Sequence, residues 1–109
     1  MPKEVNKFGI AQKEVDDWIS QYKIGYFRPL SLMASLTEEV GEVARIMNRK
    51  HGDKVAKPND LDLNLKEELS DVLFTTICIA NSEGINLDEA WQITIDKLYG
   101  RDKDRWEKK

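Results

Sequence analysis

Hydrophobic residues recur along this chain at intervals of three and four, the spacing of one face of an α-helix. Four segments carry the pattern, namely about 9–22, 31–47, 59–81 and 87–99. Glycine or proline lies between neighbouring segments, at Gly25, Pro29, Gly52, Pro58 and Gly84. No stretch of any length alternates apolar and polar residues as a strand does. The pattern therefore predicts an all-α fold of four helices.

The second and third segments carry the longest apolar seams. The second seam consists of Met33, Leu36, Val40, Val43 and Met47, and the third of Leu65, Leu69, Val72, Thr76, Ile79 and Ala80. Spacing of this kind is typical of helices packed in a bundle. We expect Ser31 to cap the second helix, Asn59 or Asp60 the third, and Asn86 the fourth.

Residues 72–80 are apolar around almost the whole circumference of the third predicted helix. A helix of that kind has to be covered on all sides. The other three helices of a single 109-residue domain, two of them short, supply little cover. We therefore expect a four-helix bundle, spanning residues 1–109, that is completed by a homo-oligomer, either a dimer or a tetramer.

Composition narrows the class of protein. With 40% hydrophobic and 34% charged residues, the chain fits a soluble helical domain. A net charge of −3 argues against general nucleic-acid binding. The longest apolar run is too short to cross a membrane, and the first residues lack a secretion signal, so a cytoplasmic location is expected. The single cysteine, Cys78, is expected to be buried and inert.

Two pairs of carboxylates lie inside these helical patterns. Glu39 and Glu42 lie three residues apart on the second helix, and Glu68 and Asp71 on the third, so each pair shares one helix face. Both pairs border the apolar seams. Packing the two seams together is therefore expected to bring the four carboxylates face to face.

Four carboxylates beside a core need more positive charge than Arg45 and Lys66 supply, because an unpaired buried charge is costly. A divalent cation would supply it, and oxygen ligands favour Mg²⁺ or Mn²⁺ over zinc. A di-iron centre needs a Glu-x-x-His motif on each of two helices, and the only histidine, His51, lies outside any such motif.

The motifs Glu38-Glu39-Val40-Gly41-Glu42 and Glu68-Leu69-Ser70-Asp71 resemble those of the MazG-type all-α nucleoside triphosphate pyrophosphohydrolases. The similarity extends through the Gly84-Ile85-Asn86-Leu87 turn and the basic tail. The resemblance implies that Glu39, Glu42, Glu68 and Asp71 are metal ligands and that Glu38 positions a water or a further metal. Ser70 departs from the pattern, since many relatives have glycine there.

The substrate contacts are less sharply defined. The resemblance implies that a base stacks near the first helix, where Trp18 and Phe27 are the candidates, although aromatic residues at helical spacing usually pack in a core. It also implies phosphate contacts from Lys97 and Arg101, which equally suit an ordinary helix C-terminus. The basic loop after the second helix is either a solvated connector or the source of Lys54 and Lys57 as phosphate contacts.

The expected function is Mg²⁺-dependent hydrolysis of nucleoside triphosphates to the monophosphate and pyrophosphate, which removes non-canonical or excess nucleotides. No G-x-x-x-x-G-K-[ST] loop for holding β and γ phosphates occurs, which favours cleavage between the α and β phosphates. The alternative is a non-catalytic helical module that binds nucleotide or metal as a regulator.

Overall fold

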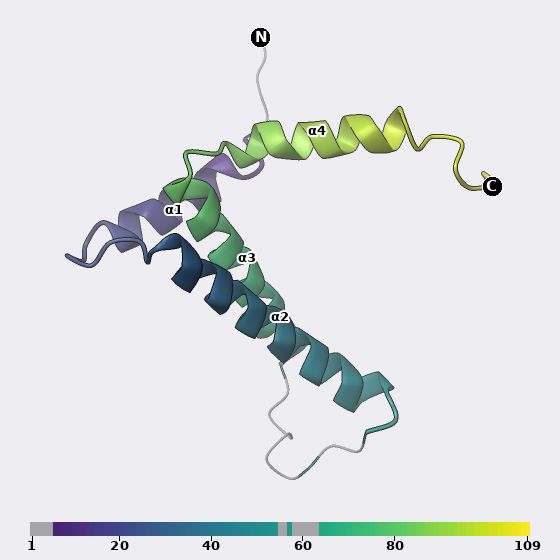
Figure 1. Ribbon diagram of the computed structural model, residues 1–109. Helices are drawn as coiled ribbons and strands as arrows, with labels where there is room; N and C mark the ends of the chain where they lie inside the picture. Colours follow the sequence, from purple (N-terminus) through teal and green to yellow (C-terminus); the bar gives the residue numbers. More distant parts are fainter. Residues whose placement is uncertain (1–5, 55–56, 58–63) are drawn as a thin grey trace.

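The computed structural model describes residues 6–54, 57 and 64–109. These residues form four helices, α1 (Gly9–Ile19), α2 (Pro29–His51), α3 (Leu65–Ser82) and α4 (Leu87–Tyr99), and no strand (Figure 1). The all-α fold predicted from the spacing is therefore confirmed. None of the helices in the described ranges is both long and apolar enough to span a membrane.

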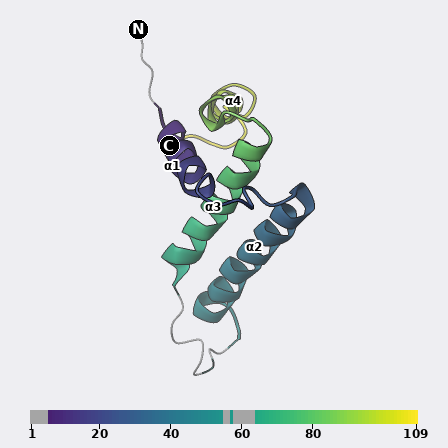
Figure 2. The ribbon, with the colours of Figure 1, turned by 90° about the vertical axis from the view of Figure 1, so that its left-hand side faces the viewer.

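Helix α3 is the centre of the arrangement. It packs most extensively against α2, and α1 packs on it as well, so that α3 lies between these two helices (Figure 2). Helices α2 and α3 run side by side in opposite directions. Helix α4 turns away from this group and projects outward (Figure 1). The radius of gyration is 17.7 Å, against roughly 13 Å for a compact chain of this length.

The helix ends follow local chemistry. Helix α2 begins at Pro29, two residues before the expected cap Ser31, because proline suits the first helical position, where an N–H has no partner. Asn59 and Asp60 lie outside the described residues, and α3 begins after Asn64, whose side chain accepts a hydrogen bond from the Glu67 N–H at 3.0 Å. Helix α1 ends at Ile19, three residues earlier than expected.

Asn86 caps α4 as predicted, because its side chain accepts hydrogen bonds from the N–H groups of Asp88 and Glu89. Gly84, which ends α3, has a positive φ of 70°. The Ile85 N–H then reaches back to the Ala80 carbonyl at 2.8 Å, a closure that favours glycine at this position.

The buried core differs from the predicted seam of α2. Among the described residues, the buried ones are Leu32, Ile46, Thr75, Ile77, Cys78 and Ala80. The predicted seam residues Met33, Val40 and Met47 are 52%, 50% and 44% exposed, so that part of the prediction is wrong. Helix α2 is rotated by about one residue, roughly 60° to 100°, from the expected orientation. The rotation places Glu39 on the packed face itself.

Polar groups fix α1 against the turn between α3 and α4. The Gln12 side chain donates to the Asn81 side-chain oxygen at 2.8 Å and to the Ile85 carbonyl at 2.9 Å, and it accepts from the Leu87 N–H at 3.0 Å. The Asp88 carboxylate accepts from the N–H groups of Phe8 and Gly9 at the start of α1. These hydrogen bonds join seven residues, three near the start of the chain and four between Asn81 and Asp88, and so fix α1 against this turn.

Candidate active site

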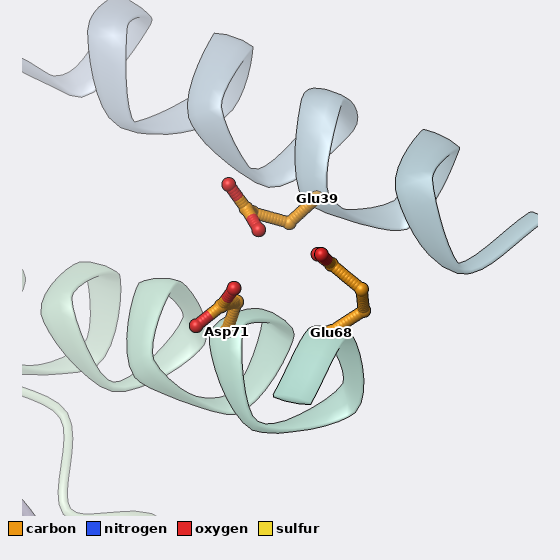
Figure 3. A group of neighbouring side chains, drawn as sticks. All are labelled: Glu39, Glu68 and Asp71. Carbon is orange, nitrogen blue, oxygen red and sulfur yellow. The ribbon is translucent and has the colours of Figure 1, made fainter. Parts of the chain in front are cut away.

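Three carboxylates from two helices converge at the α2–α3 interface. Glu39 comes from the middle of α2, and Glu68 and Asp71 from successive turns of α3 (Figure 3). Each offers an oxygen atom that lies within 4.8 Å of the other two. The three-residue spacing of Glu68 and Asp71 places both on the α3 face that meets α2. We call these three residues the carboxylate cluster.

The cluster repels its own charge. Burial raises the pKa of Glu39, and the neighbouring Asp71, Glu38 and Glu42 carboxylates and a hydrogen bond with Asp71 raise it further. Burial likewise raises the pKa of Glu68, with the Asp71, Glu39, Glu42 and Glu67 carboxylates adding to the shift. Partial burial and neighbouring carboxylates thus both disfavour the charged forms of Glu39 and Glu68, and a divalent cation bound here would offset this.

Of the other predicted acidic residues, Glu42 lies outside the cluster. Its carboxylate pairs with the Arg45 guanidinium, with an N–O distance of 3.4 Å. Its charge still contributes to the raised pKa values of Glu39 and Glu68, so it lies close to both. Glu38 is exposed on α2, beside Glu39.

An aromatic cavity of about 220 Å³ begins one helical turn from the cluster along α2 and α3. It lies between α1, α2 and α3 and is lined by Trp18, Ile19, Gly25, Tyr26, Phe27, Leu32, Ser35, Phe74, Thr75 and Cys78. Ser35 lies one helical turn before Glu39, and Thr75 one turn after Asp71. One turn advances about 6 Å along the helix axis. The cavity therefore continues the α2–α3 interface directly from the cluster.

The aromatic residues of this cavity are partly open to solvent. Trp18 is 50% exposed and meets the edges of Tyr22 and Phe74, with ring centroids 5.2 and 6.1 Å apart. Phe27 is 52% exposed, and Trp91, on α4, is 41% exposed. The expectation that aromatic residues at helical spacing, Trp18 and Phe27 among them, pack in a core is therefore not met within one protomer. Trp18 and Phe27 instead line the cavity.

Tyr26 forms part of the cavity wall and is held by two hydrogen bonds. Its hydroxyl donates to the Asp16 carboxylate at 2.7 Å and accepts from the Asn81 amide at 2.9 Å. Burial and the bond to Asp16 raise the pKa of Tyr26 to about 12, although the Asn81 contact acts in the opposite direction. Asn81 also bonds Gln12, so the wall is tied to the polar junction of α1 and α3.

Sequence reasoning missed Ser35, Tyr26, Phe74 and Thr75 as cavity residues. A signal existed for Ser35 and Thr75, because each lies four residues from a predicted ligand, on the same helix face. No comparable signal marks Tyr26, which precedes α2 in an irregular segment.

The predicted basic residues are not gathered at the cluster. Lys54 follows the last residue of α2, His51. His51 lies about 18 Å from Glu39 along the helix axis. Lys57 is exposed. Lys97 and Arg101 lie at the far end of the projecting α4 (Figure 1), where Arg101 donates two hydrogen bonds of 3.0 Å to the Asp102 carboxylate.

The chain resembles known proteins over most of its length. It is 50% identical over 98 residues to the uncharacterized protein YpjD of Bacillus subtilis (strain 168), covering 90% of this chain and 88% of YpjD. A crystal structure of YPJD from Bacillus subtilis superposes with a TM-score of 0.76 at 44% identity, covering 93% of this chain and 99% of that one.

A second crystal structure is that of the Bacillus-conserved MazG protein, a nucleotide pyrophosphohydrolase. It superposes with a TM-score of 0.74 at 46% identity, covering 94% of this chain and 99% of that chain. The profile of the MazG nucleotide pyrophosphohydrolase domain matches residues 27–106, which include the whole carboxylate cluster. The chain therefore belongs to the MazG nucleotide pyrophosphohydrolase domain family.

Proposed function

We propose that this protein is a Mg²⁺-dependent hydrolase that converts nucleoside triphosphates to nucleoside monophosphates and pyrophosphate, with Mn²⁺ as a substitute metal. The observation that carries the proposal is the convergence of Glu39, Glu68 and Asp71 within 4.8 Å, together with the raised pKa values of Glu39 and Glu68. A divalent cation offsets this uncompensated charge, and a triphosphate is a ligand that such a cation binds well.

The roles of the acidic residues follow from their positions. Glu39, Glu68 and Asp71 hold the metal, and Glu42 completes the ligand set when it leaves Arg45. Bound Mg²⁺ would neutralise charge on the triphosphate oxygens and favour attack by water. Glu38, exposed beside Glu39, is proposed to orient that water toward the α phosphorus. The bond from the α phosphorus to the bridging oxygen then breaks, and pyrophosphate leaves with that oxygen.

The aromatic cavity is proposed to receive the base of the substrate. It begins one helical turn from the carboxylate cluster, a separation of about 6 Å that matches the order of phosphate, sugar and base in a nucleotide. Trp18 supplies a half-exposed ring on which a base can stack, and Phe27 and Phe74 supply further apolar contact. The proposed role is the removal of non-canonical or excess nucleotides in the cytoplasm.

A homo-oligomer, a dimer or tetramer, is proposed to complete both the core and the site. Large apolar side chains remain exposed on three helices, among them Met33, Val40, Leu73 and Ile93. A second cavity of about 250 Å³ between α3 and α4, lined by Phe8, Leu73, Ile77 and Trp91 among others, is open to a partner. The projecting α4 would carry Lys97 and Arg101 to the partner's phosphates, and Lys54 and Lys57 would contact them from the loop.

The test is a panel of ribonucleoside and deoxyribonucleoside triphosphates incubated with the protein and Mg²⁺, with released pyrophosphate as the readout. We expect pyrophosphate release that stops when the metal is chelated. Glu67→Gln is the matched control for Glu68→Gln, because Glu67 is a neighbouring exposed glutamate that accepts a hydrogen bond from Asn64 and makes the smallest contribution to the raised pKa of Glu68. Absence of pyrophosphate with every nucleotide, or release that survives chelation, would contradict the proposal.

A further inference from the structure

The aromatic cavity is lined by a threonine whose hydroxyl forms no hydrogen bond with the described residues. Thr75 is only 7% exposed and lines the cavity. Within residues 6–54, 57 and 64–109, no hydrogen bond to its hydroxyl is formed, whereas the adjacent Thr76 hydroxyl donates to the Val72 carbonyl at 2.8 Å. Removing a hydroxyl from most of its water without giving it a partner costs free energy, so packing alone does not account for threonine at this position.

The Thr75 hydroxyl is accessible from the cavity. Among the described residues, every side-chain nitrogen or oxygen that is fully enclosed has a hydrogen-bond partner. The Thr75 hydroxyl oxygen has no hydrogen-bond partner among these residues, so it is not fully enclosed. The open space that Thr75 lines is the cavity. A molecule that fills the cavity can supply the missing partner.

Ser35 provides a second hydroxyl on the opposite wall. It lines the same cavity from α2, and its hydroxyl likewise makes no hydrogen bond within the described part of the chain. Ser35 lies one turn from Glu39, and Thr75 one turn from Asp71. Ser35 and Thr75 are therefore the cavity residues that lie one turn from the cluster on each of the two helices.

We propose that Thr75 and Ser35 are specificity-determining residues, whose hydroxyls hydrogen-bond the polar edge of the base in the cavity. This inference rests on the proposed function, since that function places a nucleotide here. At about 220 Å³ the cavity is smaller than the roughly 300–1,000 Å³ of sites for drug-sized ligands, so it suits one ring system and leaves the phosphates at the cluster.

The chemistry of the hydroxyl sets the kind of selectivity. A hydroxyl can donate and accept, so it pairs with either a carbonyl or an amino group on a base. Thr75 and Ser35 would therefore stabilise any base whose polar edge reaches their hydroxyls. The aromatic walls of the cavity would select the base by its shape. Bases that differ only by an amino group in place of a carbonyl are expected to bind within about threefold of each other.

The experiment measures binding of two ligands by calorimetry in the presence of Mg²⁺. One ligand is a nucleoside triphosphate with an imido bridge between the α and β phosphates, and the other is inorganic tripolyphosphate, which has no base. Thr75→Val is expected to weaken binding of the nucleotide analogue about tenfold. Tripolyphosphate binding should stay within about twofold, and the Tm of the free protein should stay the same or rise.

Two control variants isolate the hydroxyl. Thr75→Ser keeps it and should retain most of the analogue affinity. Thr76→Val makes the same substitution one residue away, at a side chain that lines the α3–α4 cavity instead, and should leave both affinities unchanged. Ser35→Ala is expected to weaken the analogue in the same direction as Thr75→Val.

The outcomes separate this inference from the proposed function. Equal weakening of both ligands by Thr75→Val, or a lower Tm with normal analogue binding, overturns the inference. Wild-type protein that binds the analogue no more tightly than tripolyphosphate also overturns it, even if pyrophosphate is released. Selective weakening of the analogue upholds it, even if the wild-type protein releases no pyrophosphate from any nucleotide and the proposed function fails.

Discussion

At the scale of single residues, the carboxylate cluster suits metal binding but destabilises the metal-free fold. Burial and the proximity of the other carboxylates raise the pKa values of Glu39 and Glu68. The ion pairs formed between residues of the described ranges involve other carboxylates. In the absence of metal this repulsion opposes folding. Residues kept at such a cost are typical of functional sites.

Glu68→Gln keeps the shape of the side chain and removes its charge. We expect Mg²⁺-dependent turnover to fall by at least about a hundredfold, because a metal ligand is lost. The metal-free protein should have the same Tm or a higher one, since repulsion is relieved. Activity assays and thermal unfolding in a chelator test this, with Glu67→Gln as the control. An unfolded variant, or one with near-normal turnover, would show that the ligand assignment is wrong.

The raised pKa values also give a pH dependence. A carboxyl with a raised pKa binds its proton more tightly in the folded than in the unfolded chain, so its contribution to stability is lost as pH rises above the usual value of 4.5. The Tm advantage of metal-free Glu39→Gln over wild type should therefore grow from about pH 4 to about pH 7. Thermal melts in a chelator measure it. Excess Mg²⁺ should abolish or reverse the difference, and a difference that shrinks with pH would contradict the account.

At the scale of helices and segments, Tyr26 anchors the irregular stretch between α1 and α2. Tyr26→Phe removes the hydrogen bonds to Asp16 and Asn81 and should lower the free energy of unfolding by about 1 kcal/mol at neutral pH. Because the pKa of Tyr26 is raised to about 12, wild type should lose this advantage as pH rises from about 10 toward 12. Chemical denaturation of both proteins across this range is the measurement, and a pH-independent difference would count against the two bonds.

Helices themselves were the most predictable part of the structure. The three-and-four spacing located all four, and short-range rules identified Asn86 as a cap and Gly84 as a stop. The rotation of α2 was not predictable, because Met33, Val40 and Met47 are as apolar as Leu32 and Ile46. Local sequence cannot choose between two apolar stripes when a partner can cover one of them.

The candidate site also has one part that the sequence predicts, the carboxylate cluster, and one that it does not, the aromatic cavity. The spacing of Glu39, Glu68 and Asp71 predicted their convergence, because helical periodicity is a local property. The cavity beside them depends on contacts between residues far apart in the sequence, such as Tyr26 with Asn81 and Trp18 with Phe74. Such contacts leave no periodic trace, so the place of Tyr26 in the cavity wall became visible only in the structure.

At the scale of the whole molecule, the open shape calls for a partner. The radius of gyration of 17.7 Å and the outward direction of α4 leave apolar side chains of α2, α3 and α4 in solvent. An interface of standard size covers about 800 Å² on each partner, enough to bury a stripe of this kind. In the proposed homo-oligomer, Lys97 and Arg101 would approach a partner's carboxylate cluster.

Light scattering at micromolar concentration tests the oligomer. Wild type should be a stable dimer or tetramer. Leu73→Glu, which places a charge on the exposed apolar face of α3, should shift it toward monomer with loss of activity, because Leu73 is 57% exposed in one protomer. Leu30→Glu at the start of α2, at a side chain already 84% exposed, serves as the control. A wild-type monomer with full activity would contradict this prediction.

The central claim is that the protein cleaves between the α and β phosphates, and product analysis after reaction in ¹⁸O-labelled water with Mg²⁺ tests it most directly. Attack on the α phosphorus forms a new bond from the water oxygen to that atom, and the bridging oxygen leaves with pyrophosphate. We predict one ¹⁸O atom in the nucleoside monophosphate and none in pyrophosphate, with both products lost in Glu68→Gln. Label in pyrophosphate, or labelled orthophosphate with a nucleoside diphosphate as the first products, would contradict the account.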